Sequence, residues 1–181
     1  MLTNWNLKNW ARVFTSRPFN VLEKIYINPE NFREVTTHVL DVPDWANIIG
    51  INNKGNILLI KQYRFGTDQI EIEIPGGYIE SGEQPREAAI RELREETGYE
   101  IKSIEQIGIV NANPAIMNNK CYTFLAELSE KGEVKFDPNE IIETLFASPK
   151  KVKKYLKEGE ITNTYAICGF FWYVLYNNTI F

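Results

Sequence analysis

Hydrophobic and polar positions alternate along much of the chain, and an alternation with a period of two is typical of β-strands. The clearest case is residues 69–74, where isoleucine alternates with glutamate. Apolar runs at residues 46–51 and 57–60 flank a turn-forming segment at 52–56, and this arrangement predicts a hairpin. Strands are predicted at residues 19–22, 24–27, 46–51, 57–60, 69–74, 101–110, 121–128 and 141–147, with a turn at 28–31.

Other segments have the period of a helix, and residues 84–97 are the clearest of them. Pro85 lies in the first turn, where a missing N–H costs nothing, and Gly98 can close the last turn. The apolar face consists of Ala89, Ile90 and Leu93, and further helices are predicted at residues 149–157 and 162–176. Because strands of mixed character alternate with few helices, we expect an α/β sandwich around a mixed β-sheet.

The composition limits the classes of function. The chain has 181 residues, 44% of them hydrophobic, a formal net charge of −4 and a pI of about 5.2. This charge argues against a general affinity for nucleic acid or for anionic membranes, because no overall positive field attracts phosphate polymers. Cys121 and Cys168 are too few for a disulfide framework and fit no zinc pattern. No signal peptide is recognisable and residues 165–176 are too short to span a bilayer, so we expect a cytoplasmic protein.

One segment, residues 77–99, carries most of the chemical information. It predicts a glycine-containing loop that leads into a helix rich in carboxylates, in which Glu92 and Glu96 lie on one face beside Glu95. Like charges at this spacing repel, and a divalent cation with a preference for oxygen ligands would relieve the repulsion. The alternative is a solvated helix with surface ion pairs such as Arg91 with Glu95. The fixed offsets of the glycines and carboxylates favour the metal site.

The same segment resembles the Nudix box, G-x5-E-x7-R-E-U-x-E-E-x-G-U, in which U is an apolar residue. The matching positions are Gly77, Glu83, Arg91, Glu92, Leu93, Glu95, Glu96 and Gly98. Tyr99 departs from the pattern at the final apolar position, where an aromatic ring can fill the same role. The resemblance implies a Nudix-type α/β/α sandwich around a mixed sheet. It also implies hydrolysis of a nucleoside diphosphate that is linked to another group.

The resemblance also implies roles for individual residues. Metal ligands would be Glu92, Glu96, the backbone carbonyl of Gly76 and Glu83. Glu95 would bind a further metal ion or position its ligands, and Arg91 would orient the glutamates, so both are candidate catalytic residues. The implied cofactor is Mg²⁺, with Mn²⁺ as an alternative.

Outside the box, the chain looks like the ADP-ribose pyrophosphatase group of Nudix enzymes. The residues that carry this likeness are 61–64, 71–77, 113–115 and 155–163. It implies that Arg64 contacts phosphate and that Glu73 lies beside the metal or the substrate. Pro114 and Asn118 would lie in a substrate loop. Arg64 can also be a surface residue at a strand end, and Pro114 and Asn118 can belong to an ordinary polar turn.

Two further features come from the same resemblance. Residues 137–143 look like an acidic loop that supplies the catalytic base, with Glu140 as the first candidate and Glu143 as the alternative; a solvated acidic turn is also compatible with them. Residues 1–45 look like a strand-rich extension through which such enzymes form homodimers, and residues 46–181 would form the hydrolase domain. Trp45 could stack on adenine or belong to the core.

We therefore predict an enzyme that hydrolyses the pyrophosphate of ADP-ribose or a related nucleoside diphosphate sugar. The alternatives inside the enzyme class are GDP-mannose, dinucleoside polyphosphates, NADH and damaged nucleoside triphosphates. A nucleotide-sensing module without catalysis is a further alternative, although such proteins usually lose box carboxylates. Nucleic acid and membranes are not expected as partners, and the specific substrate is left open.

Overall fold

The computed structural model describes residues 3–131 and 141–177. The chain divides into two compact units. Unit 1 consists of Met1–Pro43 with Asn111–Lys120, and unit 2 consists of Asp44–Val110 with Cys121–Phe181. Each unit has a β-sheet of its own.

Unit 1 contains a three-stranded antiparallel sheet in the order β1-β2-β3. Its strands are β1 (Asn6–Thr15), β2 (Asn20–Ile27) and β3 (Glu34–Asp41). The two short strands predicted at residues 19–22 and 24–27 are therefore one continuous strand. The predicted turn extends to Arg33, whose carbonyl accepts the N–H of Asn28 at 2.9 Å. Every residue of β1 is exposed to solvent.

Unit 2 is built around a seven-stranded mixed sheet with the order β10-β5-β4-β9-β8, in which β6 pairs with β5 and β7 with β4. Its strands are β4 (Trp45–Ile51), β5 (Ile57–Arg64), β6 (Gln69–Glu73), β7 (Gly76–Tyr78), β8 (Tyr99–Asn111), β9 (Lys120–Lys131) and β10 (Ile142–Ala147). The pairing of β4 with β9 is parallel, whereas β4 pairs with β7 and β5 pairs with β6 and β10 in the antiparallel direction. The predicted mixed sheet is confirmed.

The hairpin predicted at residues 46–60 is correct only at its turn. β4 and β5 pair at Ile51 and Ile57. Beyond this point β5 pairs with β6, and β4 pairs with β7. Residues Ala46–Gly50 are buried throughout, which suits a central strand with a parallel neighbour better than one arm of an isolated hairpin. The sheet therefore opens between β4 and β5, and the strand ends on both sides of this opening supply the pocket described below.

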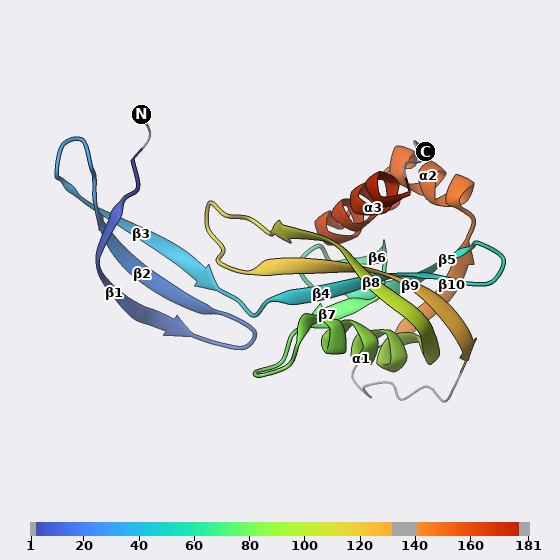
Figure 1. Ribbon diagram of the computed structural model, residues 1–181. Helices are drawn as coiled ribbons and strands as arrows, with labels where there is room; N and C mark the ends of the chain where they lie inside the picture. The colour runs from blue at the N-terminus through green and yellow to red at the C-terminus, as the bar shows by residue number, and fades with distance from the viewer. Residues whose placement is uncertain (1–2, 132–140, 178–181) are drawn as a thin grey trace. The chain divides into compact units, whose positions relative to one another are not determined.

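Three helices complete unit 2: α1 (Pro85–Thr97), α2 (Pro149–Glu158) and α3 (Thr164–Tyr176). α1 covers one face of the sheet and α2 and α3 cover the other, so that two hydrophobic cores form, one on each face (Figure 1). This is the predicted α/β/α sandwich. Within the described residues, no helix combines the length and the apolar character needed to cross a membrane.

α1 begins and ends where the sequence predicts. Gln84 is its N-cap and forms a reciprocal capping box with Glu87, and Pro85 occupies the first helical position. Gly98 closes the helix with a φ of 73°, a left-handed conformation that glycine adopts without strain. The carboxylate of Glu87 accepts the backbone N–H of Gln84 at 3.2 Å.

Candidate active site

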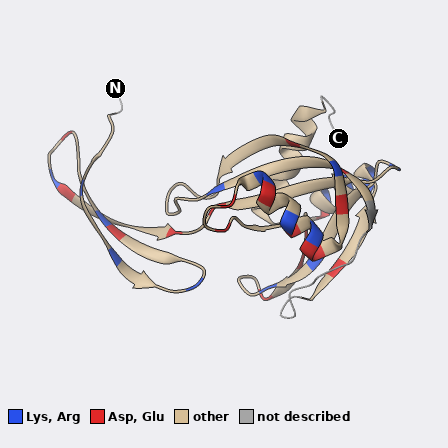
Figure 2. Ribbon diagram, turned by 60° about the horizontal axis from the view of Figure 1, so that its bottom comes forward, with Lys and Arg blue, Asp and Glu red and all other residues tan. Residues whose placement is uncertain are grey.

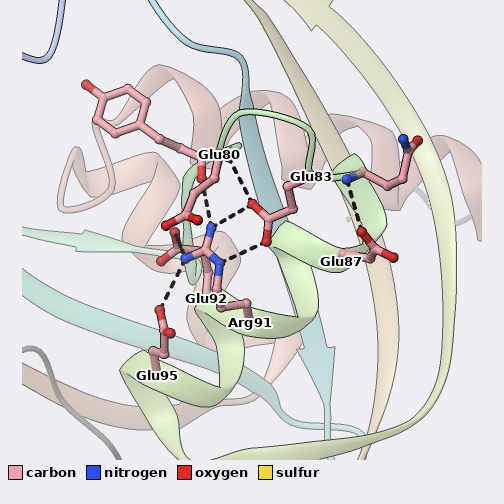
Figure 3. Close-up of polar contacts among 8 residues, drawn as sticks. Glu80, Glu83, Glu87, Arg91, Glu92 and Glu95 are labelled. Atoms are coloured by element: carbon pink, nitrogen blue, oxygen red, sulfur yellow. Dashed lines mark hydrogen bonds and ion pairs between the residues drawn. The ribbon is translucent and has the colours of Figure 1, made fainter.

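A single guanidinium, that of Arg91, contacts three acidic residues of α1 and of the loop before it. Its Nε and Nη2 donate to the two oxygens of Glu83 at 2.9 and 3.0 Å. Its Nη1 donates to Glu92 at 2.7 Å and to Glu95 at 3.2 Å, and its Nη2 also donates to the carbonyl of Tyr78 at 2.9 Å (Figure 3). We call Arg91 with Glu83, Glu92 and Glu95 the carboxylate network. The surface pair of Arg91 with Glu95 is thus present, but as one contact of a larger network.

The carboxylate network keeps an excess of negative charge. Hydrogen bonds from Arg91 hold the pKa of Glu83 below its usual range, and the same carboxylate raises the pKa of Arg91. One guanidinium thus faces three carboxylates, which leaves two formal negative charges before Glu96 is counted. Acidic and basic residues follow each other closely along α1 (Figure 2). Such an excess of negative charge attracts cations.

Glu96 is held separately, by the backbone of β7. It is 4% exposed, and its Oε2 accepts the N–H of Gly76 at 3.0 Å. The glycine that follows has a steric role, since a Cβ atom on Gly77 would lie 2.2 Å from Oε1 of Glu92. The second glycine of the Pro-Gly-Gly sequence therefore leaves the space that the carboxylate of Glu92 occupies.

A pocket of about 310 Å³ opens beside these groups. It is lined by Trp45, Gln62, Arg64, Gly76, Gly77, Tyr78, Glu80, Arg91, Glu92 and Glu96. Three carboxylates, from Glu80, Glu92 and Glu96, therefore share one concave surface with two arginines and two aromatic rings. Among the described residues, no three Asp, Glu, His or Cys side chains lie close enough together to hold a metal ion.

The donor set of this pocket nevertheless suits a hard divalent cation. Carboxylate oxygens are the ligands that Mg²⁺ and Mn²⁺ prefer, and Gly77 provides the space in which the carboxylate of Glu92 lies. In the structure Arg91 and the N–H of Gly76 hold two of these carboxylates in place. The residues present therefore fit a divalent metal ion in kind and in charge.

The other part of the pocket is aromatic. The ring of Trp45 meets the edge of Tyr78 with centroids 4.9 Å apart, and it stacks on Tyr165 at 5.5 Å with an angle of 25° between the planes. We call these three residues the aromatic cluster. The guanidinium carbon of Arg64 lies 5.9 Å from the Trp45 ring centre, within the range of a cation–π contact.

Glu73 fixes Arg64. The Nε and Nη2 of Arg64 donate to the two oxygens of Glu73 at 2.7 and 3.0 Å, which is a bidentate pair. Glu73 is 4% exposed and does not line the pocket, so its contact with the site passes through Arg64. Arg64 is consequently held at the pocket wall and is not an unconstrained surface arginine.

The predicted site residues fall into groups. The pocket wall contains Trp45, Arg64, Gly76, Arg91, Glu92 and Glu96, while Glu83 and Glu95 contact it through Arg91 and Glu73 through Arg64.

Pro114 and Asn118 belong to unit 1. There the side chain of Asn118 donates to Asp41 at 2.7 Å and accepts the N–H of Val42 at 3.2 Å. Glu140 lies outside the described residues, and Glu143 is exposed on β10 and paired with Lys61 at 3.1 Å.

Four residues of the site were not predicted as functional: Gln62, Tyr78, Glu80 and Tyr165. The first three lie in or beside the recognised motifs, so their positions along the chain were a usable signal. Tyr165 has no such signal, because it is one hundred and twenty positions after Trp45, its stacking partner.

Cys121 is buried and free, and burial raises the pKa of its thiol to about 12, so it is not a nucleophile near neutral pH.

Comparison with known proteins adds a family context to this geometry. The NUDIX domain family matches residues 43–165. The chain is 32% identical over 133 residues to an ADP-ribose pyrophosphatase of Bacillus subtilis (strain 168), which covers 71% of this chain and 69% of the relative. It is also 32% identical over 131 residues to a methanol dehydrogenase activator of Bacillus methanolicus, with coverage of 71% and 69%. The crystal structure of an ADP compounds hydrolase has the same fold, with a TM-score of 0.85 over 99% of both chains at 20% identity.

Proposed function

Because the chain belongs to the NUDIX family and is a hydrolase similar to ADP-ribose pyrophosphatases, we propose that it hydrolyses the pyrophosphate bond of ADP-ribose or a related nucleoside diphosphate sugar. The products would be a nucleoside monophosphate and a sugar phosphate. GDP-mannose, dinucleoside polyphosphates and NADH are the alternative substrates within the same reaction class.

The observation that carries this proposal is the composition of one pocket, in which carboxylates of the box face an arginine and aromatic rings. Along β4, Trp45 pairs with Tyr78 and Asn47 pairs with Gly76, whose N–H holds Glu96. Two strand residues correspond to about 7 Å. The pyrophosphate of a substrate can therefore contact the acidic side of the pocket while its organic part contacts the aromatic side.

We propose Mg²⁺ as the cofactor, with Mn²⁺ as a substitute, held by Glu92, Glu96 and the backbone carbonyl of Gly76. Glu83 would act at the same centre, and Glu80 adds a carboxylate at the pocket wall. When bound, such a cation supplies positive charge to the pyrophosphate and activates water as the nucleophile.

The chain's own residues would bind the substrate, orient the carboxylates and supply the general base. Arg64, held by Glu73, would direct its guanidinium at the phosphate oxygens, for which the planar fork is well suited. Arg91 would orient Glu83, Glu92 and Glu95. Trp45 would stack on the base of the substrate. Pro114 and Asn118 remain candidate contacts of a substrate loop. For the general base, Glu140 remains the first candidate and Glu143 the alternative.

We also propose that residues 1–45 serve dimerisation and residues 46–181 hydrolysis. β1 is an edge strand that exposes large apolar side chains, among them Leu7, Trp10 and Phe14. Exposed apolar edges of this kind are typical of protein interfaces. Light scattering would be expected to give a dimer for the wild type and a monomer for Trp10→Glu. A wild-type monomer at all concentrations would contradict this assignment.

The decisive experiment is a substrate panel. ADP-ribose, GDP-mannose, NADH and a dinucleoside polyphosphate would each be incubated with the chain and Mg²⁺, and the products separated by ion-exchange chromatography. We expect ADP-ribose to be converted to AMP and ribose phosphate with the highest kcat/KM. EDTA should abolish turnover, and added Mg²⁺ should restore it. The absence of turnover for every nucleotide sugar would overturn the proposal.

A further inference from the structure

The first turn of α3 brings the ring of Tyr165 against Trp45, beside the pocket. Its ring stacks on Trp45, which lines the pocket, whereas Tyr165 itself is not part of the pocket wall. Trp45 is the first residue of β4 and is only half-buried. Its side chain therefore depends on neighbouring rings for a defined orientation.

The start of α3 is anchored at several points. The side-chain oxygen of Asn163 caps the helix by accepting the N–H of Ala166 at 3.1 Å. The amide of Asn47, which is 1% exposed on β4, donates to the carbonyl of Tyr165 at 3.0 Å. The hydroxyl of Thr162 donates to Glu71 of β6 at 2.7 Å, and Glu71 is 8% exposed.

These anchors come from both strand pairs that border the sheet opening. Asn47 lies on β4 and Glu71 on β6, which is paired with β5. The Asn47 contact holds the carbonyl of Tyr165, the Glu71 contact holds Thr162 three residues earlier, and the stacking contact links Tyr165 to Trp45. Arg64 lies within cation–π distance of the same Trp45 ring, so the orientation of Trp45 also affects its contact with the guanidinium.

We propose that Tyr165 is a positioning residue for substrate recognition, which acts by holding Trp45 in the orientation that the organic part of the substrate requires. The inference rests on the proposed function, since it takes the pocket as the substrate site. Tyr165 does not contact the substrate. Its removal leaves the carboxylate network unchanged but allows Trp45 to occupy more rotamers, so that the substrate must order the ring when it binds.

The test compares three substitutions at one position. Tyr165→Ala removes the ring, Tyr165→Leu keeps apolar volume without an aromatic face, and Tyr165→Phe keeps the ring. We expect Tyr165→Ala and Tyr165→Leu to raise both KM and the Kd for ADP-ribose about three- to tenfold, the range of an aromatic pair. The value of kcat should stay within about twofold of the wild type, because the groups that act on the pyrophosphate are untouched. Tyr165→Phe should behave like the wild type.

Direct binding separates this inference from the proposed function. The Kd for ADP-ribose would be measured by calorimetry in EDTA, and turnover would be measured with Mg²⁺. If the wild type binds ADP-ribose without hydrolysing it, the proposed function fails while the Kd series still tests Tyr165. If the wild type hydrolyses ADP-ribose and Tyr165→Ala keeps the wild-type Kd and KM, the inference fails alone.

A matched control lies on the same helix. Tyr176 is at the other end of α3, where its hydroxyl donates to Glu105 at 2.6 Å, and it does not line the pocket described above. Tyr176→Ala should leave KM and Kd unchanged. Thermal unfolding of every variant identifies loss of fold, and Tyr165→Leu is the informative variant if Tyr165→Ala does not fold. A Tyr165→Phe protein as impaired as Tyr165→Leu would overturn the role of the ring.

Discussion

The carboxylate network and the aromatic cluster border the same pocket but are built in different ways. In the network, Arg91 contacts Glu83, Glu92 and Glu95, all within eight residues of it in the sequence. The aromatic cluster joins the start of β4, the end of β7 and the first turn of α3. The first arrangement is local to one loop and helix, whereas the second exists only after three distant segments have packed together.

This difference separates two kinds of contribution to the proposed reaction. A helix with a fixed spacing places carboxylates on one face whatever the rest of the chain does, and it can therefore supply the metal chemistry. Rings from separate elements are placed by the fold, and they can define which substrate is bound. We expect substitutions in the network to act mainly on kcat and substitutions on the aromatic side to act mainly on KM.

The largest effect should come from Glu96→Gln, at the carboxylate that shares the pocket wall with Glu92 of the network. This change keeps the volume of a 4% exposed side chain and removes its charge, so kcat should fall by at least about a hundredfold. Turnover of ADP-ribose with Mg²⁺ measures the effect. Glu100→Gln is the matched control, because Glu100 pairs with Arg94 at 2.8 Å and does not line the pocket. Loss of hydrolysis with retained ADP-ribose binding would reject a purely nucleotide-sensing role. An unchanged kcat in Glu96→Gln would contradict the metal site.

An intermediate effect is expected from Arg64→Ala. It removes the guanidinium that Glu73 directs at the pocket, and KM for ADP-ribose should rise about tenfold with a smaller change in kcat. Steady-state kinetics at saturating Mg²⁺ would measure both. Lys54→Ala is the control, since Lys54 is exposed in the turn before β5 and does not line the pocket. A drop in kcat without a change in KM would place Arg64 functionally with the network and break the comparison.

The smallest effect concerns stability, at a pair between α1 and β8, Arg94 with Glu100, that lies outside the pocket. Arg94 lowers the pKa of Glu100 from its usual value of 4.5 through a bidentate hydrogen bond. The folded pKa is depressed, so the stabilisation is present above pH 4.5 and is lost as the pH falls through the lower, folded value. Because both side chains are about half exposed, Glu100→Gln should lower the free energy of unfolding at pH 7 by less than about 1 kcal/mol.

Urea unfolding of the wild type and of Glu100→Gln at pH 7 and at about pH 3 tests this expectation. The difference between the two proteins should shrink at the lower pH. A difference that grows as the pH falls would contradict the assigned direction of the pKa change.

Most of the secondary structure was predictable because it depends on neighbours in the sequence. The ends of α1 follow from Gln84, Pro85 and Gly98, and the strand at residues 69–74 follows from its alternation. The hairpin at residues 46–60 was overestimated, because a turn signal says nothing about which strands continue to pair beyond it. That outcome depends on β7 and β9, which pair with β4, and on β6, which pairs with β5.

The sequence by itself determined the carboxylates of the network and their spacing, because helical geometry converts a spacing of three or four residues into a shared face. It also identified Arg64 and Trp45 as candidates, through motifs and residue type. Only the tertiary structure decided that Glu73 holds Arg64, that Gly77 makes room for Glu92 and that Tyr165 stacks on Trp45. These contacts join residues that are 9, 15 and 120 positions apart, and no local rule relates such positions. The packing of strands and helices around the opening in the sheet brings them together.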